Sequence, residues 1–182
     1  MKKLLLITGD LATGKSTFAA ILSARYNCPA LCKDKIKEIL ADTVGFTNRE
    51  ENLRLSRATM EIMIHCFSRM ALSGGDIILE ANFRQTEMDS LSKIAEENGY
   101  EMLTLQLRAD VDILYARFIN RIENENRHPA HISGFDSYEG FCSYILKARD
   151  EKPTGQVIDI CADDFSYQTD GDIIREIDRF WG

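Results

Sequence analysis

The sequence predicts an α/β fold in which a mainly parallel sheet of about five strands lies between two layers of helices. Three observations support this prediction. Short apolar runs alternate with segments of helical periodicity along the 182 residues, which is the pattern of repeated strand–helix units. Two runs, KKLLLIT and DIILE, are apolar almost throughout, as expected of strands buried on both faces. The first run leads directly into a glycine-rich loop and then into a helical pattern.

The elements follow in order along the chain. Strands are expected at residues 2–8, 76–80, 101–107 and 156–160, with a shorter candidate at 29–32. Helices are expected from Lys15 onward and over residues 35–41, 48–72, 86–98, 110–124, 136–149 and 170–180. Helix N-termini are expected at Thr47 with Glu50, at Thr86 with Asp89, and at Asp136 with Glu139. In the long helix 48–72, Leu53, Met60, Met63 and Phe67 are predicted to face the core.

Length and composition predict a single domain spanning 1–182. The net charge of −7 disfavours binding to a long nucleic acid or an anionic membrane. Five cysteines, an odd number, favour reduced thiols over a disulfide framework. The N-terminal MKKLLLIT has a short apolar run that fits a buried strand better than an export signal. We therefore expect a cytoplasmic protein that does not bind membranes.

The segment GDLATGKST carries the strongest chemical signal. Gly9 and Gly14, followed by Lys15 and Ser16, form a Gly-x4-Gly-Lys-Ser pattern between a predicted strand and a predicted helix. Glycines let backbone N–H groups converge on a phosphate, and the helix N-terminus adds its positive end. Lys15 is expected to bridge the β- and γ-phosphates, and Ser16 to bind Mg²⁺. The loop residues expected to contact the nucleotide are Gly9, Asp10, Leu11, Ala12, Thr13, Gly14, Lys15, Ser16 and Thr17.

This loop refines the predicted fold to a P-loop NTPase, a three-layer α/β/α sandwich, with ATP and Mg²⁺ as cofactors. The side chain of Asp10 is expected to point away from the phosphates and to bond to the loop backbone. Two other nucleotide-binding patterns are better explained locally. LSGGD at 72–76 is read as a helix C-terminus and turn, and DTVG at 42–45 follows a helical stretch instead of a strand.

Carboxylates follow two of the predicted strands. Asp34 comes after the short second strand, where it could accept a proton from a hydroxyl or bind Mg²⁺ through water. It also suits the N-cap of the helix 35–41. Glu80 ends the third strand and is a candidate metal ligand. Asn82 and Arg84 follow in the turn and could contact an acceptor or a phosphate.

Arginines mark a predicted lid at about residues 121–136. Arg117 and Arg121 are four residues apart and share one face of the helix 110–124, away from its apolar side. Arg127 lies in the following loop with His128 and His131. Such a loop can close over phosphates, exclude water and neutralise transition-state charge. The two histidines lack further ligands and are expected to make hydrogen bonds within the loop.

With these residues identified, the chain resembles the small P-loop kinases that include polynucleotide kinase, gluconate kinase, zeta toxins and chloramphenicol phosphotransferase. The matching segments are GDLATGKST, CKD, IILEANF, LYARFINR with RHPAH, and VIDICADDF. The resemblance implies transfer of the ATP γ-phosphoryl group to a hydroxyl. It implies that Asp34 is the catalytic or metal-linked acid, that Arg117 and Arg121 contact the nucleotide and form part of the lid, and that the stretch after Asp159 passes near the adenine. Glu80 departs from the group, in which many members have Asp.

The predicted function is an ATP/Mg²⁺-dependent phosphotransferase acting on a hydroxyl of a small-molecule acceptor. Its expected catalytic residues are Lys15, Asp34 and Arg121; Arg117, Arg121 and Arg127 are further nucleotide contacts, and Ser16, Asp34 and Glu80 are metal ligands. Two alternatives remain open: a regulatory module that binds and hydrolyses ATP, and a polynucleotide 5′-hydroxyl kinase. The sequence leaves open the acceptor, the oligomeric state and the choice between ATP and GTP.

Overall fold

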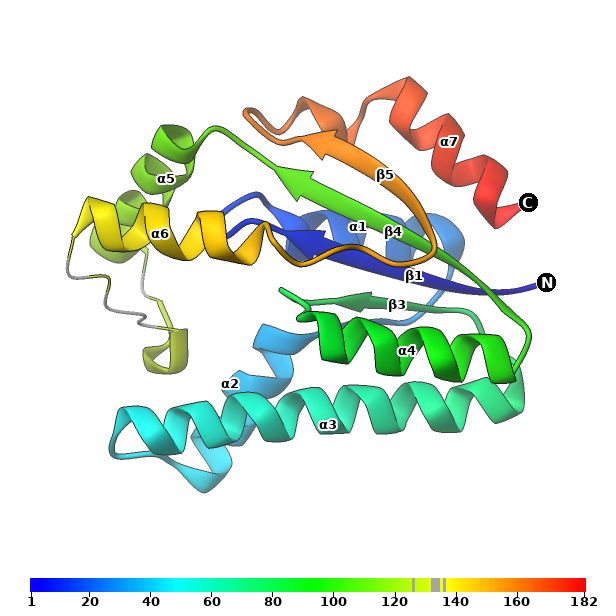
Figure 1. The fold of residues 1–182 in the computed structure, drawn as a ribbon, viewed down its shortest axis with the longest axis horizontal. Helices are drawn as coiled ribbons and strands as arrows, with labels where there is room; N and C mark the ends of the chain where they lie inside the picture. Colours follow the sequence, from blue (N-terminus) through cyan, green and yellow to red (C-terminus); the bar gives the residue numbers. More distant parts are fainter. Residues whose placement is uncertain (126, 132–134, 136) are drawn as a thin grey trace.

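The protein is built on a five-stranded parallel sheet (Figure 1). The computed structural model describes residues 1–125, 127–131, 135 and 137–182. The strands are β1 (Lys2–Gly9), β2 (Ala30–Cys32), β3 (Ile77–Glu80), β4 (Tyr100–Arg108) and β5 (Gln156–Cys161). They lie in the order β2-β3-β1-β4-β5, and every pairing is parallel. The predicted strands and the predicted α/β class are confirmed.

Helices cover both faces of the sheet. They are α1 (Lys15–Tyr26), α2 (Lys33–Val44), α3 (Arg49–Ser73), α4 (Gln85–Glu97), α5 (Val111–Asn124), α6 (Tyr138–Ala148) and α7 (Gly171–Trp181), with short 3-10 turns η1 (Pro129–His131) and η2 (Ser166–Gln168). Alternate residues of β1 point to opposite faces, as pleating requires. Leu5 and Ile7 pack with α1, α5, α6 and α7, whereas Leu4 and Leu6 pack with α3 and α4. This arrangement is the predicted three-layer sandwich.

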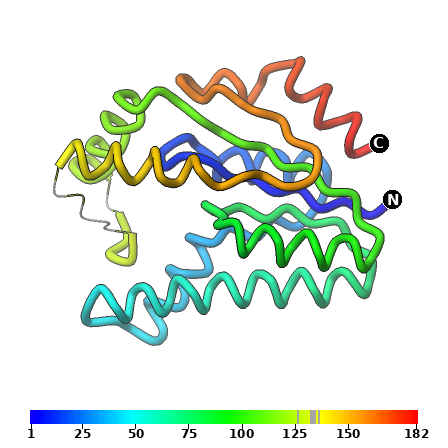
Figure 2. The backbone as a smooth tube through the Cα atoms, in the orientation of Figure 1, coloured from blue at the N-terminus to red at the C-terminus, as the bar shows by residue number. Residues whose placement is uncertain are grey.

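The strands all run in one direction, which sets where a ligand can bind. Both chain termini lie at one end of the molecule, and the carboxyl ends of the strands face the opposite end (Figure 2). The loops after β1, β3 and β4 and the start of α2 therefore meet at this second end, together with η1 between α5 and α6 (Figure 1). In a parallel sheet this edge is the expected binding site.

Helix N-termini differ from the prediction in their details. The observed N-caps are Asn48, Arg84 and Ser137 in place of Thr47, Thr86 and Asp136; Asp136 lies outside the described residues. Asn48 accepts a hydrogen bond from the N–H of Glu51 at 3.0 Å, so Glu51 occupies the position expected for Glu50. Several neighbouring polar side chains could cap each helix, and the path of the preceding loop selects among them. Leu53, expected in the core, is 47% exposed.

The two segments that resemble nucleotide-binding motifs, LSGGD and DTVG, are helix ends in the structure, as predicted. The LSGGD segment ends α3, where Gly74 has a φ of +87° and its N–H donates to the carbonyl of Met70 at 2.9 Å. The DTVG segment lies at the end of α2. Among the described residues, no helix combines the length and apolar character needed to cross a membrane.

Candidate active site

The loop between β1 and α1 has the backbone form of a phosphate cradle. Gly9 and Gly14 have φ values of +118° and +86°, which side-chain-bearing residues rarely adopt. A Cβ on Gly9 would overlap the carbonyl oxygen of Leu107 in β4, and one on Gly14 would lie 2.8 Å from the hydroxyl of Tyr167. Both positions therefore require glycine, because the loop passes directly against the sheet and against η2.

Asp10 anchors this loop to two distant segments. Asp10 is buried, and its carboxylate pairs with the Arg149 guanidinium through contacts of 2.7 and 3.2 Å. It also accepts a hydrogen bond from the N–H of Ala109 at 3.2 Å. Asp10 is thus structural, as expected, but its partners follow β4 and α6 instead of belonging to the loop. The prediction that Asp10 also contacts the nucleotide remains a prediction.

Lys15 is a buried cation held inside the loop. Its ammonium donates to the carbonyl oxygens of Gly9, at 3.3 Å, and of Asp10. Burial lowers the pKa of Lys15, while the carboxylates of Glu80 and Asp34 act in the opposite direction. A buried ammonium among backbone N–H groups is well suited to an incoming polyphosphate, whose charge would offset the cost of burial.

Ser16 and Glu80 meet beside Lys15. The Ser16 hydroxyl donates to the Glu80 carboxylate at 3.0 Å, and Glu80 is 5% exposed. The pairing of β1 with β3 places Ile7 opposite Glu80, so the strand end faces the start of α1. Burial raises the pKa of Glu80, and the charge of Lys15 opposes that rise. The structure thus brings together two of the three predicted metal ligands.

These two oxygens fit a magnesium site. Mg²⁺ takes hard oxygen ligands and is usually bound by one or two carboxylates together with phosphates and water. A hydroxyl and a buried carboxylate beside a phosphate loop are such a set. The described residues contain no group of three or more His, Cys, Asp or Glu side chains that could hold a metal ion. A Mg²⁺ ion at this position would therefore share its coordination with nucleotide phosphates.

Asp34 lies apart from this pair. The prediction that it caps a helix is wrong, because α2 begins earlier: Cys32 is the N-cap and Asp34 belongs to the first turn. Its side chain is 59% exposed, and its nearest basic neighbour is the His131 imidazole, whose Nδ1 is 3.7 Å from a carboxylate oxygen. Its charge still acts on Lys15 and on Arg127. Asp34 is therefore an exposed carboxylate whose charge reaches the loop lysine.

Arg117 joins α5 to the loop after β5. Its guanidinium donates to the carbonyls of Ala162 and Asp163, both at 2.7 Å, and lies 4.3 Å from the centre of the Phe165 ring. Phe165 is 47% exposed and flanks Gly14. Phe165 is not among the residues predicted from the sequence, although its position as an aromatic residue in ADDF was the available signal. Arg117 and the partly exposed ring of Phe165 thus lie together beside the phosphate loop.

Arg121 and Arg127 extend the positive field over the loop. The charge of Arg121 acts on Lys15, and burial together with Arg121 lowers the pKa of Arg127. The guanidinium of Arg127 lies 5.9 Å from the centre of the Phe118 ring. The predicted lid arginines thus share one region with Lys15 and Asp34, which the positions along the chain alone do not show.

Residues 127–131 of the predicted lid are docked on α2 and α3. The carbonyl of Ala130 accepts hydrogen bonds from Lys37 at 2.8 Å and from Asn52 at 3.1 Å. His128 contacts Asp42 at 3.0 Å and His131 contacts Glu38 at 3.1 Å, so both histidines bond to α2; only the bond from the N–H of Ala130 to Nδ1 of His128, at 3.1 Å, lies within the loop as expected. Lys37 and Asn52 were not selected from the sequence. Residues 126, 132–134 and 136 of the predicted lid lie outside the described residues.

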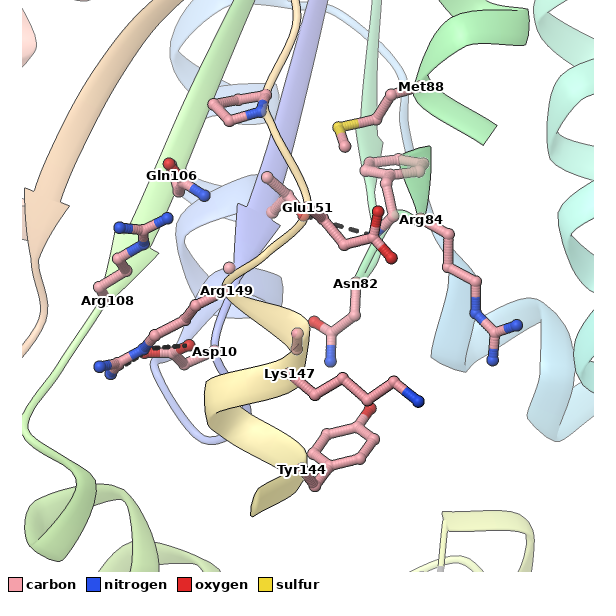
Figure 3. A pocket seen from close by; sticks show the side chains of 15 residues that line it. Asp10, Asn82, Arg84, Met88, Gln106, Arg108, Tyr144, Lys147, Arg149 and Glu151 are labelled. Carbon is pink, nitrogen blue, oxygen red and sulfur yellow. Dashed lines mark hydrogen bonds and ion pairs between the residues drawn. The ribbon is translucent and has the colours of Figure 1, made fainter. Parts of the chain in front are cut away.

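A pocket of about 350 Å³ adjoins the phosphate loop (Figure 3). It lies at the carboxyl ends of β1, β3 and β4 and is closed on one side by the last turns of α6. Its lining includes Asn82 and Arg84, which the sequence analysis selected, and Arg108, Tyr144 and Lys147, which it did not. Figure 3 shows Tyr144 and Lys147 projecting from α6, and Asn82 and Arg84 from the segment after β3.

The strand order, the phosphate loop at the end of β1 and the arginine-bearing segment after α5 define a P-loop kinase. Comparison with known proteins agrees. The family model described as AAA domain matches residues 5–136, and the chain belongs to this family, as one of its small P-loop kinases.

The relatives are kinases. A shikimate kinase from Rhodopirellula baltica is 30% identical over 153 residues, which cover 77% of this chain and 73% of that protein. A candidate kinase from Chloroflexus aurantiacus j-10-fl superposes with a TM-score of 0.82 at 26% identity, over 98% of this chain and 97% of the other. A gluconokinase from Sinorhizobium meliloti 1021 shares the fold, with a TM-score of 0.60 at 14% identity over 98% and 91% of the two chains. The chain is thus an enzyme of a small-molecule kinase family that uses ATP.

Proposed function

We propose that this protein transfers the γ-phosphoryl group of ATP, with Mg²⁺, to a hydroxyl of a small-molecule acceptor. The observation that carries the proposal is the cluster at the end of β1. Lys15 in the phosphate loop lies beside the pair formed by Ser16 and Glu80, and the charge of the exposed Asp34 acts on the same lysine. Groups that bind the donor phosphates, with a candidate base near them, are what a transferase needs.

The donor half follows from the loop. The ammonium of Lys15 would exchange the carbonyls of Gly9 and Asp10 for β- and γ-phosphate oxygens. Ser16 and Glu80 would hold Mg²⁺, which neutralises phosphate charge when bound. The surface formed by Arg117 and Phe165 beside Gly14 is suited to stacking against adenine.

The transfer step follows from Asp34 and the arginines. The acceptor oxygen attacks the γ-phosphorus as its O–H proton passes to the Asp34 carboxylate, and the bond to the β–γ bridging oxygen breaks to leave ADP. Arg121 and Arg127 would stabilise the negative charge on the transferred group. Arginine suits this role because its planar fork matches phosphate oxygens.

The test compares three variants with the wild type. Enzyme is mixed with ATP labelled in the γ-phosphoryl group and a small-metabolite extract, and mass spectrometry identifies labelled products. ATP binding is measured separately by calorimetry. We expect Lys15→Ala to lose ATP binding. Asp34→Asn should keep ATP binding but transfer at least about 100-fold more slowly, since a general base contributes about that factor. Asp89→Asn, an exposed carboxylate on α4, is the matched control and should behave as the wild type.

The outcomes separate the alternatives. Release of ADP with no labelled product from any extract would support a regulatory ATPase instead of a transferase. Label appearing on polynucleotide ends, with binding that weakens steeply as salt rises, would support a polynucleotide kinase. Normal transfer by Asp34→Asn would refute the assignment of the base while leaving the kinase reaction in place.

A further inference from the structure

The pocket beside the phosphate loop is positively charged in a chain whose net charge is −7. Its lining has four basic side chains and two carboxylates: Arg84, Arg108, Lys147 and Arg149 against Asp10 and Glu151. Both carboxylates are already engaged. Asp10 pairs with Arg149, and Glu151 accepts a hydrogen bond from the N–H of Gln85 at 2.7 Å. Within the described part of the chain, the other three cations of the lining have no carboxylate partner.

Arg108 has an unused donor inside this lining. With its amide oriented to satisfy both neighbours, Gln106 accepts from the Arg108 guanidinium at 3.0 Å and donates to Asp159 at 3.1 Å. The Nε atom of Arg108 is buried and has no hydrogen-bond partner among the described residues. A buried donor without a partner is costly, so a ligand that supplies an acceptor here would be favoured.

The ammonium of Lys33 is a further positive charge near Arg84. Burial lowers the pKa of Lys33 at the start of α2; the carboxylates of Glu87 and Asp34 oppose that change, and the charge of Arg84 adds to it. Arg84 and Lys147 project toward the same side of the pocket, and the Asn82 amide lies to one side of their charged ends in this view (Figure 3). Like charges held together at a pocket entrance repel one another, and a bound anion relieves that repulsion.

The rest of the lining suits a small organic body. Phe83, Met88 and Pro153 supply apolar surface, and Tyr144 adds an aromatic ring with a hydroxyl. The volume of about 350 Å³ is near the lower end for small-molecule sites. Thr8 and Gly9 also line the pocket, and Asn82 lies two residues after Glu80, so a compound bound here abuts the phosphate loop.

We propose that this pocket is the acceptor site and that the acceptor carries an anionic group, a carboxylate or a phosphate, bound by Arg84 and Lys147. The inference rests on the proposed function, since it names the class of compound that receives the phosphoryl group. The anion lies on the Arg84 and Lys147 side, and the acceptor's hydroxyls face Asn82 and the phosphate loop.

The first test needs no knowledge of the acceptor. A small-metabolite extract is separated at pH 7.5 on an anion-exchange resin into retained and unretained fractions. Each fraction is incubated with the enzyme and an excess of γ-labelled ATP, and labelled products are counted. We expect label only with the retained fraction. Treating that fraction with a phosphatase, which is then removed, separates the two sources: lost activity indicates a phosphate, and surviving activity indicates a carboxylate.

The second test uses Arg84→Gln and Lys147→Gln with the active fraction. Each should raise the apparent KM for the acceptor by about tenfold or more, the effect of losing one charge-assisted hydrogen bond, and should change the KM for ATP far less. Lys93→Gln is the control, because Lys93 lies on the exposed side of α4 with only a 4.0 Å pair to Glu97. Its kinetics should match the wild type.

Each result is decisive. Label from the unretained fraction alone would overturn the anionic acceptor while leaving the kinase reaction intact. Equal KM values for the wild type and both variants would remove Arg84 and Lys147 from the acceptor site. If neither fraction yields a labelled product, the proposed function fails, and the inference fails with it.

Discussion

The pair between Asp10 and Arg149 gives the sharpest prediction about stability, because the two partners differ in exposure. Arg149 binds Asp10 through two contacts of 2.7 and 3.2 Å and donates to the carbonyl of Ala109 at 2.6 Å. The Asp10 side chain is 2% exposed, whereas that of Arg149 is 27% exposed. Removing Arg149 leaves the buried Asp10 carboxylate without its charged partner. Removing the Asp10 carboxylate leaves the Arg149 guanidinium, which water can reach.

The magnitudes follow from this difference. Arg149→Met should lower the free energy of unfolding by about 3–5 kcal/mol, the usual cost of leaving a buried charge unpaired. For a chain of this size that corresponds to a fall in Tm of roughly 6–20 °C. Asp10→Asn should cost about 1 kcal/mol, because asparagine can still accept from the Ala109 N–H and Arg149 can be solvated.

The assay is urea unfolding followed by circular dichroism for the wild type, both single variants and the double variant. The double variant should be more stable than Arg149→Met alone, because no buried carboxylate remains. Arg175→Met is the control: its pair with Asp172 is exposed and should contribute less than about 1 kcal/mol. Equal costs for Arg149→Met and Asp10→Asn, or strictly additive costs in the double variant, would refute this reasoning.

Three further predictions concern the loop and the thiols. Lys15→Met should abolish the rise in Tm caused by Mg-ATP, because the buried ammonium is the cation inside the phosphate loop; an undiminished rise in Tm would contradict this. Gly9→Ala should prevent folding, judged by circular dichroism, since its Cβ would overlap a carbonyl of β4, whereas Gly45→Ala, with open space around it, should fold. Burial raises the pKa of Cys28 to about 12, so iodoacetamide at pH 8 should modify exposed Cys161 first in peptide mass spectra; equal rates would count against the burial argument.

Sequence reasoning succeeded where the signal is local. The motif of a phosphate-binding loop consists of residues close together in the sequence, so Gly9 to Ser16 could be identified directly. Strands buried on both faces leave continuous apolar runs, and all five predicted strands are present. Helix N-termini were less accurate, because Thr47, Asn48 and their neighbours are all competent caps and the loop geometry decides between them.

The candidate site depends on contacts between residues that are far apart in the sequence, and no local sequence pattern predicts such contacts. Ser16 and Glu80 are 64 residues apart, and Asp10 and Arg149 are 139 residues apart. Asp34 could be placed after a strand, but whether it faced Lys15 depended on β2 lying at the edge beside β3. The order of the strands in the sheet is set by the crossover connections between them, so no single segment of the sequence determines it.

The sequence by itself determined that this chain binds a nucleotide phosphate and folds as an α/β sandwich, because backbone freedom at glycine and burial of apolar runs are properties of short segments. Only the tertiary structure decided which groups lie together around the phosphate loop and line the pocket beside it. Arg108 and Lys147 show why: one ends β4 and the other lies in α6, and they line one pocket because parallel strands bring their carboxyl ends to the same edge of the sheet.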